Sequence, residues 1–119
     1  MKTSELQGAA LDWAVALAEG EDYSCNMPEI IGNQLYYSHH GEVCEYSPST
    51  QWALGGPIIE RERIAVLCPT TGDFFDARDT KTFRLHPVYS RGATYLEAAM
   101  RCYVASKLGD EVAIPEELL

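Results

Sequence analysis

The segment GATYLEAAMRCYVASKLG, residues 92–109, predicts the most clearly marked element of this chain, an amphipathic helix. Thr94 and Glu97 have the spacing of a capping box, in which two side chains bond backbone N–H groups at a helix start. Gly109 follows the last apolar residue, as glycine does after many helices. Apolar residues recur at three- and four-residue steps and therefore share one face. They are Leu96, Ala99, Met100, Tyr103, Val104 and Leu108.

A second helix is predicted near the start of the chain. Ser4 and Gln7 repeat the capping-box spacing, and Gly20 is its expected end. Its apolar positions are Leu6, Ala10, Trp13 and Leu17. At the other end of the chain, Val112 and Ile114 precede Pro115, which predicts an extended tail packed back on the body.

Short strands are predicted between these helices. QLYYS (34–38) and EVCEY (42–46) form a hairpin pattern across His39, His40 and Gly41. Residues 21–33 have loop composition, with a short helical turn expected after Pro28.

Three further segments have strand character. RIAVLC (63–68) predicts a buried strand, while DFFDA (73–77) and KTFRLH (81–86) are weaker candidates on either side of a polar turn at Arg78 and Asp79. The order helix, short strands, helix predicts an α+β fold, with N-terminal and C-terminal amphipathic helices packed on a small antiparallel sheet. With no repeat and no linker, residues 1–119 are expected to form a single domain.

Composition and charge narrow the class of protein. The chain has 119 residues, is 46% hydrophobic and carries a net charge of −9, which is globular and not disordered composition. No apolar run approaches the ~20 residues that span a bilayer. The first twenty residues contain Glu5 and Asp12 and lack the pattern of a signal peptide, so a cytoplasmic protein is expected.

The charge is unevenly distributed. Residues 61–101 hold seven of the nine basic side chains and five acidic ones, so this segment carries +2 and the flanks carry −11. The net negative charge of the chain would repel nucleic acid and anionic membranes, and neither is expected as a direct partner. A small anion could still bind the basic centre.

Cysteine and histidine positions do not indicate a metal site or a disulfide framework. Cys25, Cys44, Cys68 and Cys102 are widely spaced, without a CxxC pair, and are expected to be thiols. His39 and His40 are adjacent, and adjacent residues on a strand point to opposite faces, so the two cannot bind one ion and no metal is expected. No cofactor is expected either. No nucleophile lies in a recognised frame such as GxSxG, and we expect no enzyme.

The segment YSPSTQWALGGPIIERER, residues 46–63, is the candidate ligand-binding loop. Pro57 suits the first position of a short helix, where free N–H groups favour an anion, and two glycines allow close approach to a ligand. Serine and threonine supply hydroxyl donors, and the aromatic rings can stack on a base. The predicted site comprises Tyr46, Ser47, Ser49, Thr50, Trp52, Gly55, Gly56 and Arg61. The same residues are also compatible with ordinary turn chemistry, with Trp52 in the core.

Three blocks together resemble a known family. MKTSELQGAALDWAVALAEG, YSPSTQWALGGPIIERE and AAMRCYVASKLGDEVAIPEEL are similar to the NinX-like family of small phage proteins, encoded among accessory genes of lambda-like and P22-like bacteriophages and prophages. The resemblance covers both ends and the middle loop, roughly half of the chain. It implies a function directed at the host, in the host cell cytoplasm, and it supplies no catalytic residues.

Two functions are compatible with these observations. The first is a non-enzymatic accessory protein that binds a small anionic nucleotide-like ligand and so sequesters a host defence signal, with its pocket at a homo-oligomer interface. The alternative is an acidic inhibitor that binds a host protein through exposed tyrosines (Tyr36, Tyr37, Tyr89, Tyr95) or imitates DNA with its terminal acids. These acids are Glu19, Glu21, Asp22, Asp110, Glu111, Glu116 and Glu117. A solvated acidic surface explains them equally well.

Overall fold

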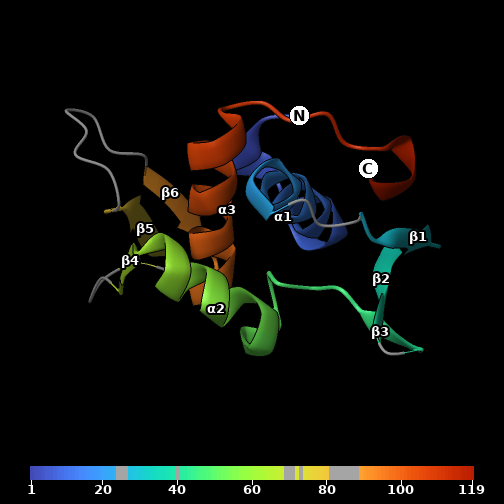
Figure 1. Ribbon diagram of the computed structural model, residues 1–119. Helices are drawn as coiled ribbons and strands as arrows, with labels where there is room; N and C mark the ends of the chain where they lie inside the picture. The colour runs from blue at the N-terminus through green and yellow to red at the C-terminus, as the bar shows by residue number, and fades with distance from the viewer. Residues whose placement is uncertain (24–26, 40, 69–71, 73, 81–88) are drawn as a thin grey trace.

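The computed structural model describes residues 1–23, 27–39, 41–68, 72, 74–80 and 89–119. Three helices lie between two antiparallel sheets, ordered β1-β2-β3 and β4-β5-β6 (Figure 1). The helices are α1 (Gly8–Tyr23), α2 (Trp52–Glu62) and α3 (Tyr95–Leu108), with short 3-10 turns at Thr3–Glu5 and Glu116–Leu118. The strands are β1 (Glu29–Ile31), β2 (Gln34–His39), β3 (Glu42–Glu45), β4 (Ile64–Leu67), β5 (Phe75–Asp79) and β6 (Tyr89–Gly92). The predicted α+β class with terminal helices is confirmed; the full-length α2 and the second sheet were not predicted.

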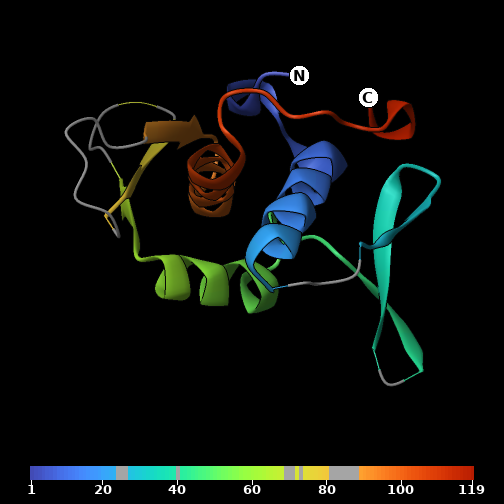
Figure 2. The same cartoon turned by 45° about the horizontal axis from the view of Figure 1, so that its top comes forward.

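Helix α3 forms where the sequence predicts it and lies at the centre of the molecule. The Thr94 hydroxyl accepts the Glu97 N–H at 3.1 Å, and Gly109 ends the helix with a φ of 87°. The helix packs on the β4–β6 sheet and on α1 (Figure 2). Arg101 pairs with Glu97 at 2.8 Å and donates to the Leu6 carbonyl at 2.7 Å. The buried residues of α3 are Leu96, Ala98, Ala99, Met100, Cys102, Tyr103 and Val104.

Helix α1 differs from its prediction at both ends. It starts at Gly8 and not at the Ser4–Gln7 box, and Gly20 lies inside it without the positive φ of a helix-ending glycine. Of the predicted apolar positions, Leu6 and Ala10 are buried as expected, whereas Trp13 and Leu17 are half-buried. The fully or nearly buried apolar residues are Ala10, Leu11, Ala14, Val15, Ala16 and Ala18. The four alanine side chains let this face approach its neighbours closely, and Leu11 and Val15 are fully buried with them.

The β2–β3 hairpin is confirmed, with Tyr37 opposite Cys44 and Ser38 opposite Val43. The helical turn predicted after Pro28 is wrong, because β1 occupies these residues and pairs with β2. The β1–β2 turn places Gly32 at a φ of 67°, the conformation that a type II′ hairpin turn requires of its first central residue.

The second sheet corrects two predictions. β4 is an edge strand and not a buried one, and Leu67 is 65% exposed. Arg78 and Asp79 belong to β5, paired with Tyr89 and Ile64. The predicted polar turn at Arg78 is therefore wrong, and the 81–86 strand candidate lies outside the described residues.

The tail packs back on the body, as predicted, and residues 109–112 pair with the first three residues of the chain. Val112 N–H donates to the Met1 carbonyl at 3.0 Å, and the Met1 amine donates to the Val112 carbonyl at 3.0 Å. The buried Thr3 hydroxyl donates to Gly109 at 2.7 Å. No helix in the described ranges is long and apolar enough to cross a membrane. The described cysteines form no disulfide, and burial raises the pKa of Cys102 to about 12.

Candidate functional site

The 46–63 segment folds as a tight turn followed by a full helix. The Ser47 carbonyl accepts the N–H groups of Thr50 and Gln51 at 3.0 and 2.8 Å, which closes the turn. Helix α2 then begins at Trp52, and the Gly55 N–H donates to Gln51 at 2.9 Å. The prediction that Pro57 starts the helix is wrong, because Pro57 is its sixth residue. The Gly55 amide is thus used by the helix and cannot form the predicted anion site.

Three of the predicted site residues are buried within the fold. Ser47 and Ser49 are each only 4% exposed. Gly55 is buried where α2 meets the Pro48 carbonyl and Leu96, with no room for a Cβ atom. These three residues shape the turn and the helix contact.

Other predicted residues lie at the surface. Trp52 is 57% exposed, so the alternative that places it in the core is wrong. Its ring lies 5.1 Å from the ring of Tyr95 at the start of α3. Thr50 is exposed, and Gly56 is half-buried under the Trp52 ring.

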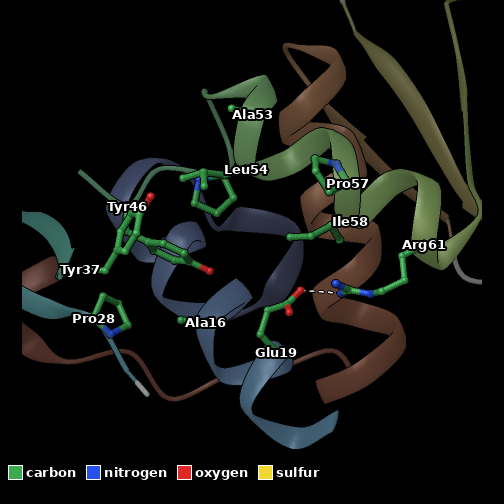
Figure 3. A pocket seen from close by; sticks show the side chains of 11 residues that line it. Ala16, Glu19, Pro28, Tyr37, Tyr46, Ala53, Leu54, Pro57, Ile58 and Arg61 are labelled. Carbon is green, nitrogen blue, oxygen red and sulfur yellow. Dashed lines mark hydrogen bonds and ion pairs between the residues drawn. The ribbon is translucent and has the colours of Figure 1, made fainter. Parts of the chain in front are cut away.

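The remaining two predicted residues, Tyr46 and Arg61, line one pocket together (Figure 3). We call it the tyrosine pocket; its volume is about 360 Å³. It lies between α1, α2 and the β1–β3 sheet, and most of its wall is apolar. The lining residues are Ala16, Glu19, Pro28, Tyr37, Tyr46, Pro48, Ala53, Leu54, Pro57, Ile58 and Arg61.

One face of α2 forms a long wall of this pocket. Ala53, Leu54, Pro57, Ile58 and Arg61 recur at the steps that align side chains along a helix. Proline has no N–H, so Pro57 cannot bond the Ala53 carbonyl four residues earlier. The helix presents proline and aliphatic side chains to the pocket, and the Arg61 cation is the last of its lining residues.

Two tyrosines form one end of the pocket. The rings of Tyr37 and Tyr46 are 6.0 Å apart and nearly perpendicular, at 86°. Tyr37 belongs to β2, and Tyr46 comes directly after β3. The Tyr46 N–H donates to the carbonyl of Leu35 in β2 at 2.8 Å. This edge-to-face arrangement is favourable for aromatic rings and leaves flat apolar surface at the pocket wall.

The opposite end is polar and its charges are paired. Arg61 lies 2.6 Å from Glu19 of α1 and 2.9 Å from Glu62, and donates to the Tyr103 hydroxyl at 3.3 Å. Lys107 approaches Glu62 at 3.6 Å. Burial alone would lower the pKa of Arg61, but hydrogen bonds to the two carboxylates raise it above its ordinary value. Burial also raises the pKa of Tyr103, aided by Glu19, so its hydroxyl stays protonated.

A buried acid supports the wall nearest α1. Asp12 is 3% exposed and accepts the Ser49 N–H at 2.8 Å, which ties α1 to the turn that carries Pro48. Burial raises the pKa of Asp12 to about 6; contacts with Ser49 oppose the rise, and the charge of Glu45 adds to it.

The pocket thus combines an apolar body with one donor–acceptor pair, which suits a flat ligand with a polar edge. Sequence reasoning missed Tyr37 as a lining residue and Glu19 as a pocket carboxylate. The signal for Glu19 is weak: it is an acid near the end of an alanine-rich helix. Among the described residues, no three His, Cys, Asp or Glu side chains gather as a metal site requires.

Comparison with known proteins gives one family. A family model described as Bacteriophage P22, NinX, matches residues 2–107. This match confirms the resemblance drawn from the three sequence blocks. No curated protein matches the chain.

Proposed function

Because the chain belongs to the phage NinX family, we propose that it is a non-enzymatic accessory protein that binds a small nucleotide-like ligand in the tyrosine pocket. The observation that carries this proposal is one apolar space bounded by two tyrosine rings and a fixed ion pair. Sequestering such a molecule of the host, including a defence signal, would be a suitable task for an accessory protein.

The size and walls of the pocket support a ligand of this kind. Sites for small molecules have volumes of about 300–1,000 Å³ and mostly apolar walls with a few placed polar groups. A volume of about 360 Å³ lies at the lower end of this range, which suits one ring system with a short substituent. Stacking of a base on an aromatic side chain contributes roughly 1–3 kcal/mol.

Isothermal titration of the full chain against nucleosides, nucleoside monophosphates and cyclic nucleotides tests the proposal. Tyr37→Ala should weaken binding of the best ligand by roughly fivefold to a hundredfold, because it removes one ring surface. Tyr36→Ala is the matched control, since adjacent strand residues point to opposite faces and Tyr36 does not line the pocket. No heat with any of these ligands, or an equal loss of affinity in the two variants, would count against the proposal. Turnover of a ligand would show an enzyme instead.

A protein partner is the second candidate, favoured by the outer face of the β1–β3 sheet. Strand register puts Ile31, Tyr36 and Val43 on the face opposite Tyr37, and Ile31 and Val43 are 55% and 69% exposed. Exposed Glu29 and Glu45 flank Tyr36 on this face. An apolar surface rimmed by acids fits a partner with a basic rim.

The terminal acids and tyrosines of this alternative are divided among several surfaces. Glu19 is 13% exposed and belongs to the tyrosine pocket, whereas Glu116 and Glu117 are exposed on the tail. Tyr36 and Tyr37 are on the first sheet, while Tyr89 is on β6 and Tyr95 starts α3. Pull-down from host lysate with Val43→Lys and wild-type chains tests the outer face: a specific partner should be lost from the variant and weakened by salt.

A further inference from the structure

The polar end of the tyrosine pocket is electrically balanced. Arg61 and Lys107 carry two positive charges against the two negative charges of Glu19 and Glu62, within the contacts described above. A phosphate entering here would add negative charge beside the Glu19 and Glu62 carboxylates, whereas a neutral group would not. The net charge of −9 further disfavours the approach of an anion.

The same end presents an acceptor and a donor next to each other. The Glu19 carboxylate and the Arg61 guanidinium lie 2.6 Å apart, and their side chains are 13% and 34% exposed. Both belong to the pocket lining, and Figure 3 shows them side by side at the end away from the tyrosines. A carboxylate only accepts hydrogen bonds, and a guanidinium only donates them.

Neutral nucleobases match this pair. Their polar edges place an N–H donor beside a carbonyl or ring-nitrogen acceptor, so one edge can bond Glu19 and Arg61 at once. The ring would then extend along the apolar α2 wall toward Tyr37 and Tyr46. The sugar and any phosphate would remain at the mouth of the pocket.

Resting on the proposed function, we infer that the pocket recognises the neutral edge of a nucleobase through Glu19 and Arg61, and that phosphate contributes little to binding. The ligand class is therefore a nucleoside or free base, with nucleotides bound through the same part. This differs from a site that reads phosphate, which would use uncompensated cations or helix N–H groups.

The test compares matched ligands on the full chain by isothermal titration. Adenosine and inosine should bind within about threefold of their 5′-monophosphates, with little change between 50 and 300 mM salt, since no net ligand charge is read. Purine riboside keeps the ring and sugar but lacks the exocyclic group. It should bind roughly tenfold to a hundredfold more weakly than the better of the two nucleosides, because a hydrogen bond to a charged group is lost.

A protein variant gives an independent readout. Glu19→Gln keeps the shape but adds an amide donor, so it should reduce nucleoside affinity and narrow the gap to purine riboside. Its circular dichroism and melting temperature show whether the fold is retained, and the ligand comparison stands without it. Monophosphates that bind more than tenfold tighter than nucleosides would overturn this inference and leave the proposed function intact. Absence of binding by every ligand would overturn both.

Discussion

Two neighbouring glycines in α2 have opposite steric surroundings, although the sequence presents them as one Gly-Gly pair. A Cβ atom on Gly55 would overlap the Pro48 carbonyl oxygen and lie 2.7 Å from Leu96. A Cβ on Gly56 would meet only the Trp52 ring, at 3.8 Å, which is ordinary contact. Gly55 therefore sets the closeness of α2 to its neighbours, whereas Gly56 carries no such constraint.

We therefore expect opposite effects from the two alanine substitutions. Gly56→Ala should raise the free energy of unfolding by about 0.5–1 kcal/mol, because alanine is the better helix former. Gly55→Ala should lower it by roughly 1–3 kcal/mol, because overpacking outweighs that gain. Urea titration of both variants measures the difference, and stabilisation by Gly55→Ala would show that α2 can move away from the turn without cost.

The buried Asp12 carboxyl should make stability depend on pH. Its pKa rises from 3.8 to about 6 in the folded chain, with burial as the main cause. Between these values the folded state binds more protons than the unfolded state, so the free energy of unfolding falls as pH rises through this window. A shift of about two units corresponds to roughly 3 kcal/mol, lost by pH 7.

Asp12→Asn isolates this effect, because asparagine keeps an oxygen for the Ser49 N–H and does not titrate. The stability of the wild type relative to Asp12→Asn should fall by roughly 2–2.5 kcal/mol between pH 4 and pH 7, since part of the effect is already lost at pH 4. Exposed Glu117→Gln serves as the control for general charge effects. Parallel pH profiles for wild type and Asp12→Asn would contradict the prediction.

At the scale of elements, local signals predicted α3 well and α2 poorly. The cap and apolar stripe of α3 are properties of adjacent residues, so the sequence alone could reveal them. Gly-Gly-Pro disfavours a helix, and α2 forms because Gly55 and Ile58 pack against distant parts of the chain. Tertiary contacts of this kind are invisible to local propensity.

The candidate site shows the same division. Tyr46 and Arg61 could be selected because they belong to one unusual segment. Arg61 bonds Glu19 across 42 residues, and Tyr37 joins through the strand pairing of a separate sheet. Those neighbours depend on where the fold places α1 and β2 relative to α2, which no spacing rule in the sequence encodes.

The cap of α3 gives the prediction at this scale. Thr94→Ala removes the acceptor for the Glu97 N–H and should lower the free energy of unfolding by about 1 kcal/mol. Thr94→Ser keeps the hydroxyl and should remain within about 0.5 kcal/mol of wild type. Thermal and urea unfolding of both variants measure this, and equal losses would mean that the threonine methyl matters and not the cap.

At the scale of the whole molecule, the paired chain ends close one side of the fold. Residues 109–112 bond residues 1–3 through backbone and side chain, and Val112 is 8% exposed. Val112 belongs to the same core cluster as α1 and α3, and Ile114 packs against it. The short tail is thus part of the core, although it lies beyond the last long helix.

Two truncations separate this contribution from that of the tail end. Removing residues 111–119 deletes Val112 and its backbone pairing with Met1, and should cost roughly 3 kcal/mol of unfolding free energy from apolar burial and hydrogen bonds. Removing only residues 116–119, which are exposed or half-buried, should change stability by less than about 0.5 kcal/mol. The two deletions differ by one acidic residue, Glu111, so relief of charge repulsion cannot account for a large difference. Urea unfolding of both truncated chains measures the contrast, and equal stabilities would mean that the core closes without the tail.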